Sequence, residues 1–232
     1  RNTRCIMATT NYGVAPTYVK IASQTLSATG SITFSNIPQG YTDLIVAVDN
    51  AQSSSGTPGI CLRFNGDTGS TYSQTFLEGT GSSPSSTRLI TTQTYINSGN
   101  AVGLSPTANQ PGSATFNIQS YSSPSVFKSV IFKSNQPAGS APGTSLSAAM
   151  WRSTAPITSI TILAQTVSFL SGMNATIYGI KAALTPKAIG GDVVVNDGTY
   201  WYHAFKNSGS FVTKQALTAD FLMVGGGGSG GG

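Results

Sequence analysis

Charged residues are scarce in this chain of 232 residues: Asp, Glu, Lys and Arg together make up only 8% of it. An ordinary globular domain has about 25%. The scarcity argues against a helical cytosolic protein, because surface helices need charged side chains on their solvent face. Ser and Thr alone form about a quarter of the chain, and 27 Gly and 11 Pro come in addition. This composition is typical of a β-rich protein whose turns are built from Gly, Asn, Ser and Pro.

Acidic residues are scarcer than basic ones, seven against twelve, so the net charge is +5. The basic residues of the central part stand singly along the chain: Arg63, Arg88, Lys128, Lys133, Arg152 and Lys181. They do not form the stripe that neutralises the phosphates of a nucleic acid, so no nucleic-acid partner is expected. Runs of about 18 apolar residues are also missing, so no membrane-spanning helix and no membrane insertion are expected.

Cysteine and histidine are nearly absent, which limits the possible chemistry. Cys5 and Cys61 allow one disulfide at most, and Cys61 stands in an apolar strand pattern typical of a buried small side chain. His203, the only histidine, lies far in sequence from Cys61 and is flanked by aromatic residues. A nucleophile needs a base held against it, so no catalytic pair is predicted.

The few carboxylates do not indicate an active site. Asp43 and Asp49 bracket an apolar strand pattern, and Asp67 belongs to a turn. Asn65, Asp67 and Ser70 could offer oxygen atoms to Ca²⁺, but the repeated acids and the closing Glu of an EF-hand loop are missing. The sequence therefore predicts that the protein is not an enzyme and that it holds no metal and no cofactor.

Short runs of alternating apolar residues, separated by turn clusters, recur through the first 185 residues. They predict strands at 19–26, 32–34, 44–48, 60–64, 72–77, 91–96, 114–120, 126–133, 146–151, 157–163 and 175–181. The continuous apolar run 44–48 predicts a strand covered on both faces. Asn65-Gly66-Asp67 predicts a hairpin turn. The Ser, Gly and Pro-rich stretches 52–59, 79–87 and 136–145 are expected to be loops. This pattern predicts an all-β fold, an antiparallel β-sandwich or jelly roll.

Three parts are predicted along the chain: a connecting segment 1–17, a sandwich body 18–185 and a glycine-rich tail 186–232. The tail carries strand patterns at 192–195, 200–205 and 218–224, and Gly190-Gly191 is expected to be a flexible joint. The chain opens on Arg1 without a signal-peptide pattern and closes on seven Gly and one Ser at 225–232. We expect it to be part of a longer product.

Several stretches of the body together form a recognisable sequence pattern. They are IASQTL at 21–26, ITFSNIPQ at 32–39, YTDL at 41–44, LRFNGDTG at 62–69 with YS at 72–73, WRSTAPITSIT at 151–161 and IYGI at 177–180. Together they resemble a virion-protein domain of marine tailed bacteriophages, and they span nearly all of 18–182.

The tail resembles a second phage element. Its stretches GTYWYHAF at 198–205, SGSF at 208–211 and ADFLMV at 219–224, followed by polyglycine, look like the glycine-rich domain of phage tail fibres and adhesins. The sequence departs from that family by stopping inside the glycine run.

These resemblances imply a structural virion protein, a tail-fibre component involved in host attachment and located on the phage particle. Two alternatives stay open: a capsid head-fibre or decoration protein of the same fold, and an adhesin that binds host cell-surface glycan. Tyr72, Tyr95, Tyr121 and Trp151 could stack on sugars, although core or subunit packing explains such aromatics better. The expected partners are other copies of the chain, as a homotrimer, and other virion proteins.

The tail carries the predicted oligomer contact. Its strand patterns contain few large apolar residues, and a unit of about 45 residues buries too little surface to offset its chain entropy alone. We therefore expect it to fold against its symmetry mates or the body. The contact residues predicted from the aromatic run are Tyr200, Trp201, Tyr202 and Phe205.

Overall fold

The computed structural model describes residues 17–79, 83–98, 104, 110–136, 143–181, 186–196 and 200–225. Every regular element among them is a β-strand, which confirms the all-β class. No helix long and apolar enough to cross a membrane occurs in these ranges. The chain divides into two compact units, of which one is Thr17–Ala182 and the other includes the described residues from Pro186 to Gly225. The connecting segment predicted at 1–17 lies outside the described residues apart from Thr17.

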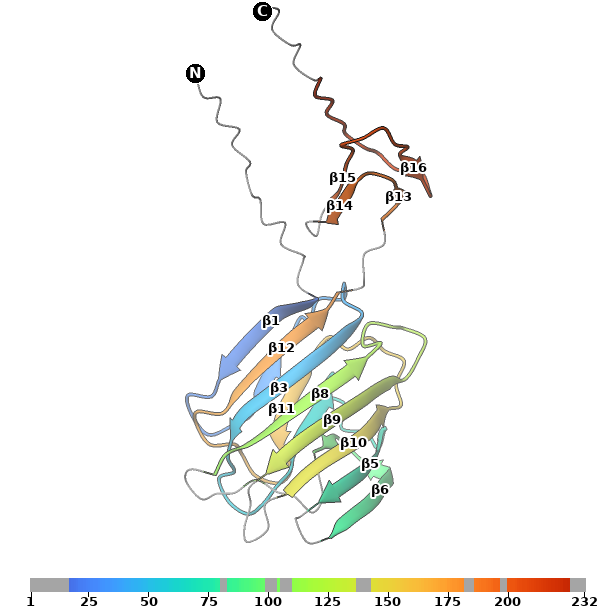
Figure 1. Ribbon diagram of the computed structural model, residues 1–232. Helices are drawn as coiled ribbons and strands as arrows, with labels where there is room; N and C mark the ends of the chain where they lie inside the picture. The colour runs from blue at the N-terminus through green and yellow to red at the C-terminus, as the bar shows by residue number, and fades with distance from the viewer. Residues whose placement is uncertain are drawn as a thin grey trace, which may run out of the picture. The chain divides into compact units, whose positions relative to one another are not determined.

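The larger sheet of the body contains eight antiparallel strands in the order β1-β12-β3-β8-β9-β10-β5-β6. It faces the viewer in Figure 1. Its strands are β1 (Tyr18–Thr25), β3 (Asp43–Ala51), β5 (Tyr72–Gly79), β6 (Pro84–Gln93), β8 (Gly112–Gln119), β9 (Lys128–Gln136), β10 (Gly143–Trp151) and β12 (Asn174–Ile180).

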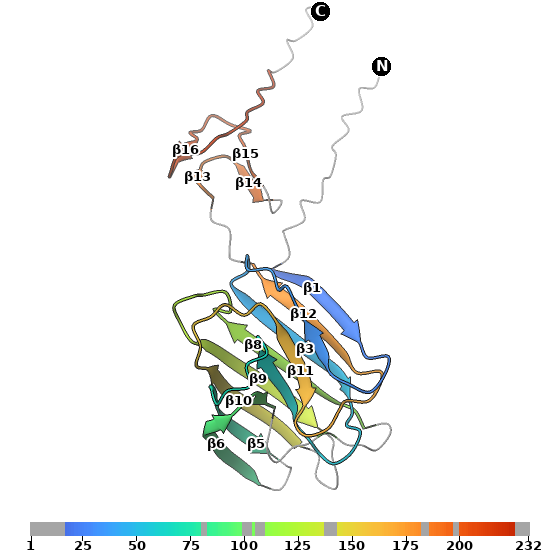
Figure 2. The same cartoon turned by 180° about the vertical axis from the view of Figure 1, so that it is seen from behind.

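The smaller sheet contains four antiparallel strands in the order β2-β11-β4-β7, and the view from behind brings β11 to the front (Figure 2). Its strands are β2 (Ile32–Phe34), β4 (Ile60–Phe64), β7 (Ile96–Asn97) and β11 (Ile160–Ala164). The two sheets form a sandwich, as the alternating apolar pattern predicts.

Apolar side chains between the sheets form one core. In β3, Leu44, Val46 and Val48 point inward and are fully buried, whereas Ile45 and Ala47 point outward and are half-buried. The prediction that this run is covered on both faces is therefore wrong. A sandwich of two sheets leaves the outer face of each sheet uncovered within the chain, and only the inner face meets apolar neighbours.

The predicted turn after β4 forms, but it does not make a hairpin. Asn65 and Gly66 have φ angles of 51° and 67°, and the Asp67 amide donates to the Phe64 carbonyl at 2.8 Å. This geometry is the one expected of Asn-Gly. However, β4 pairs with β11 and β7 in the smaller sheet, and β5 pairs with β10 and β6 in the larger one. The turn therefore joins the two sheets at a corner.

The stretch predicted as a loop at 79–87 is partly strand, because β6 begins at Pro84. Since β6 is an edge strand and Pro84 is its first residue, the missing amide of proline leaves no ladder bond unmade. The strand predicted at 91–96 is divided between the end of β6 and β7. The loop at 52–59 forms no strand beyond a single bridge from Ser53 to Phe169. The loop predicted at 136–145 is wrong at both ends, because Gln136 ends β9 and residues 143–145 begin β10, which pair with each other; residues 137–142 lie outside the described part.

The tail unit contains two pairs of short antiparallel strands. They are β13 (Ala188–Ile189) with β16 (Val212–Thr213), and β14 (Val193–Asn196) with β15 (Trp201–Ala204). Among the described tail residues, only Ala188 is buried. The strand predicted at 218–224 is wrong, because this stretch has no regular structure. Its apolar pattern suits a strand, but a strand also needs a hydrogen-bonded neighbour, and no described strand of the tail pairs with it.

Gly179 in β12 lies at a tightly packed position, against the ring of Tyr41. A Cβ atom added there would lie 2.3 Å from the Tyr41 ring, whereas one added at Gly79 in β5 would meet nothing within 4 Å. We expect Gly179→Ala to lower the free energy of unfolding by about 1–3 kcal/mol through overpacking. Gly79→Ala, the matched control, should leave it unchanged or slightly raised, as urea denaturation would measure. Equal stability of the two variants would contradict this packing.

Candidate functional site

The two residues most suited to nucleophilic chemistry belong to different compact units. Cys61 is fully buried in β4, and burial raises the pKa of its thiol far above the usual range. His203 belongs to the tail unit, where its Nδ1 atom lies 2.6 Å from the Gly190 carbonyl oxygen. In the described part of the chain, no three His, Cys, Asp or Glu side chains cluster as metal ligands would.

Asn65 and Asp67 use their oxygens to hold the corner between the sheets. The Asn65 Oδ1 atom accepts from the amides of Thr158 and Ser159 at 2.8 and 3.1 Å, and its Nδ2 atom donates to the Pro156 carbonyl at 2.8 Å. These bonds connect the turn to the segment that precedes β11. The asparagine is therefore a structural clamp, as expected from turn chemistry and not from cation binding.

The Asp67 carboxylate accepts three short hydrogen bonds. Oδ2 accepts from the Thr71 hydroxyl at 2.6 Å and from Trp151 Nε1 at 2.7 Å, and Oδ1 accepts from the Gly69 amide at 2.8 Å. Burial alone would raise the pKa of this carboxyl, but the three donors together hold it below its ordinary value. The carboxylate is thus fully used within the protein, and it binds the segment just before β5 to the end of β10.

We expect Asp67→Asn to reduce the free energy of unfolding by about 1–3 kcal/mol at neutral pH, because the amide has one acceptor oxygen in place of two. Its NH2 group then faces a donor, which is either the Gly69 amide or the pair Thr71 and Trp151. Since the folded carboxyl has a lowered pKa, its stabilisation is complete above the unfolded pKa of about 4 and is lost as pH falls through the folded value. The difference between wild type and variant should therefore shrink in acid. Urea denaturation from pH 7 to pH 3 would measure it, and a constant difference would refute the role.

The aromatic residues considered for sugar stacking are mostly in the core. Tyr72, Tyr121 and Trp151 are buried, and only Tyr95 is half-buried. Tyr72 and Trp151 pack with Phe64, the ring centroids of Tyr72 and Trp151 being 6.4 Å apart. The Tyr72 hydroxyl also accepts from the Phe64 amide at 3.0 Å. Their role is packing, which the sequence favoured over sugar binding.

One buried cation is likewise structural. The Lys128 ammonium at the start of β9 donates to the carbonyls of Ser123, Val126 and Thr154 at 2.6, 2.7 and 3.1 Å. Burial lowers the pKa of this amine. Three acceptors match the three N–H bonds of an ammonium, so none is left for a ligand.

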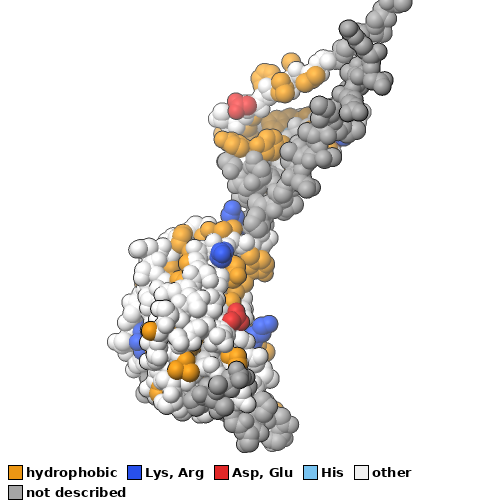
Figure 3. Space-filling model, turned by 90° about the vertical axis from the view of Figure 1, so that its left-hand side faces the viewer, with side chains coloured by type: hydrophobic (Ala, Val, Ile, Leu, Met, Phe, Trp, Pro, Cys, Tyr) orange, Lys and Arg blue, Asp and Glu red, His pale blue; other side chains and the backbone are white. Residues whose placement is uncertain are grey.

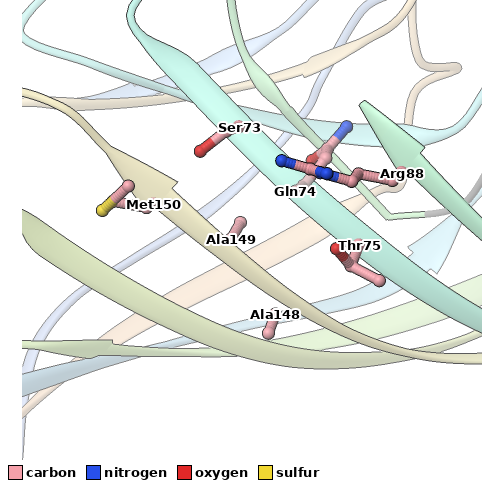
Figure 4. Close-up of a pocket in the computed structure, with 7 residues that line it drawn as sticks. All are labelled: Ser73, Gln74, Thr75, Arg88, Ala148, Ala149 and Met150. Atoms are coloured by element: carbon pink, nitrogen blue, oxygen red, sulfur yellow. The ribbon is translucent and has the colours of Figure 1, made fainter. Parts of the chain in front are cut away.

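The outer face of the larger sheet carries two shallow hollows. One, of about 280 Å³, lies over β5 and β10, and Figure 4 shows Arg88 extending from β6 towards β5 beside it. A second hollow of about 260 Å³ lies over β8 and β9. Sites for small molecules are usually enclosed clefts of about 300–1,000 Å³. The outer face is therefore better suited to a broad partner than to a small ligand.

An apolar stripe crosses this outer face. It consists of Leu77, Leu146, Ile131, Ala148 and Met150, which lie on β5, β10 and β9. Leu77 stands directly opposite Leu146, and Ile131 stands opposite Ala148. Leu77 and Leu146 are 58% and 54% exposed, and Ile131 and Met150 are 45% and 37% exposed. Contiguous apolar surface of this kind marks interaction sites.

The residues predicted as the tail oligomer contact lie on and beside β15. Trp201 is half-buried, whereas Tyr200, Tyr202 and Phe205 are exposed. Phe205 also packs against Gly209, where a Cβ atom would lie 3.0 Å from the ring. The structure thus brings the four aromatics onto one short hairpin strand and its ends. Their part in oligomer assembly stays a prediction.

We expect Trp201→Ala to abolish assembly of the tail while the body keeps its fold, because the indole is the largest side chain of β15. Size-exclusion chromatography with light scattering would follow the mass, and far-UV circular dichroism would follow the body. Phe221→Ala removes an aromatic side chain that is 85% exposed outside β15 and serves as the control. An unchanged mass of the Trp201 variant would refute the contact.

Comparison with known proteins identified no matching family model, no curated relative and no solved structure with significant similarity.

Proposed function

We propose that this chain is a structural protein of a tailed-bacteriophage virion, a tail-fibre component that takes part in host attachment. The observation that carries the proposal is the convergence of the stretches that resemble phage virion proteins. Asn65 of the stretch 62–69 binds the backbone at Pro156, Thr158 and Ser159 of the stretch 151–161. In addition, Gln39 of the stretch 32–39 donates from Nε2 to the Ile157 carbonyl at 3.0 Å.

These bonds make the resembling residues parts of one framework. The Ile37 amide also donates to the Thr158 carbonyl at 3.0 Å, so the stretches 32–39 and 151–161 meet in their backbones too. The stretches therefore belong to one domain. The phage origin is proposed from their resemblance, as a set, to virion proteins.

The surface of the body supports a structural role. On the side shown in Figure 3, charged side chains are sparse among surface that is mostly neither charged nor hydrophobic. Contacts made by such a surface depend little on salt, because little of their energy is Coulombic. The inward position of Tyr72, Tyr121 and Trp151 removes the strongest candidates for glycan stacking from the body surface. We therefore favour a fibre component over a glycan-binding lectin.

Immunogold electron microscopy of phage particles with an antibody against the body would test the proposal. We expect label along the tail fibres and slower adsorption of antibody-treated particles to host cells. A non-binding antibody of the same class is the control for adsorption. Label confined to the capsid would favour the head-fibre or decoration protein, and particles that contain no trace of the chain by mass spectrometry would refute a virion role.

A further inference from the structure

The outer face of the larger sheet has two halves of different charge. One half consists of β9, β10, β5 and β6 and carries the apolar stripe. Its outward charged side chains are Lys133 on β9 and Arg88 on β6, and no outward Asp or Glu accompanies them among the side chains that the structure describes. Glu78 on β5 points inward and is buried. This cationic half is therefore both apolar and positive.

The other half consists of β3, β12 and β1 and carries the acids. Asp43 and Asp49 lie at the two ends of the outward side of β3. Between them Ile45 faces outward opposite Tyr178 of β12, and both are half-buried. Lys20 lies beyond them on the edge strand β1. This acidic half offers apolar side chains with negative charge beside them.

The halves are continuous across the sheet. One outward row runs from Tyr178 through Ile45, Asn117 and Ile131 to Ala148 by direct cross-strand pairing. Lys133, Arg88 and Asp49 make no hydrogen bond or ion pair within the described part of the chain. The cationic half therefore offers positive charge with no acid beside it in the described ranges. The acidic half offers the Asp49 carboxylate, while its Asp43 accepts from the Ser120 amide at 2.8 Å and its Lys20 stands at the far edge on β1.

The face is also large enough for a stable interface. Its strands are seven to ten residues long. With strands about 4.8 Å apart and a rise of about 3.3 Å per residue, eight of them cover about 1,000 Å². A stable protein–protein interface takes about 800 Å² from each partner.

Association through the sheet edges is less favourable than association through the face. The β6 edge begins with Pro84, which offers no amide, and the pairing of β6 with β5 is interrupted by a bulge. The β1 edge carries Lys20 and a bulge between Lys20 and Ala22. Proline, lysine and bulges are devices that block strand addition at an edge.

We propose that the outer face of the larger sheet is a self-association surface, on which the cationic half of one copy lies against the acidic half of another. The apolar stripe then covers Ile45, Tyr178 and their neighbours, while Lys133 and Arg88 lie beside acids of the second copy. Because each copy carries both halves, the acidic half of the second copy can lie on the cationic half of the first while its cationic half lies on the acidic half of the first. The proposal does not depend on a virion location and goes beyond the tail contact.

Sedimentation velocity of the full chain over a range of concentrations tests the surface. We expect Leu146→Lys to weaken self-association at least tenfold, because it places a charge in the centre of the stripe. Leu222→Lys, which changes an 87% exposed leucine of the tail, is the matched control and should leave body association unchanged. Leu77→Lys is a second variant in the stripe, and circular dichroism verifies the fold of each.

A charge exchange tests the arrangement of the halves. Lys133→Glu should weaken association, because the new carboxylate meets acids of the second copy, and Asp49→Lys should weaken it as well. The double variant Lys133→Glu, Asp49→Lys should regain a large part of the loss. If like halves face each other, Lys133→Glu relieves repulsion and strengthens association, which overturns the arrangement. A monomeric wild type, or folded stripe variants that associate as the wild type does, overturns the surface itself.

Discussion

The burial of apolar side chains between two sheets of unequal width is the interaction on which the body depends. Each sheet alone has one apolar face, and only the other sheet removes that face from water. Because the larger sheet has twice as many strands, its inner face does not stay apolar throughout. On β9, β10 and β5 it includes Ser134, Ser145, Ser147 and Glu78, all of them buried. Ser145 and Ser147 meet there through their hydroxyls at 2.9 Å.

The alternation of apolar residues was enough to predict the fold class and most strands of the body, because period two is a local property of the chain. Strand partners are not local. Asn65-Gly66 fixes a tight turn whatever follows, so the sequence could not tell a hairpin from a corner between sheets. Pro84 and the serines around it resemble a loop, yet they form an edge strand because β5 supplies a partner on one side. At 218–224 the pattern is right for a strand, but no described strand pairs with it.

The candidate surface was harder to predict than the fold. Alternation shows that Leu146, Ala148 and Met150 share one face of their strand, but not whether that face is inside or outside. Only the register with β5 and β9 places Leu77 and Ile131 beside them. For Tyr72 and Trp151 the sequence favoured packing, and the hydrogen bonds to Phe64 and Asp67 give the physical reason.

The clamp formed by Asn65 also bears on how long the molecule survives chemically. In a flexible chain, the amide nitrogen of a glycine attacks the side-chain carbonyl carbon of a preceding asparagine and expels ammonia. Water then opens the resulting succinimide ring to aspartate or isoaspartate. Here three hydrogen bonds fix the Asn65 side chain on the 156–159 segment. Asn65, which the turn requires for its geometry, is thereby protected from the deamidation to which an Asn-Gly dipeptide is prone. If the chain is a virion component, as proposed, it is assembled once and not renewed, and such protection then matters as much as equilibrium stability.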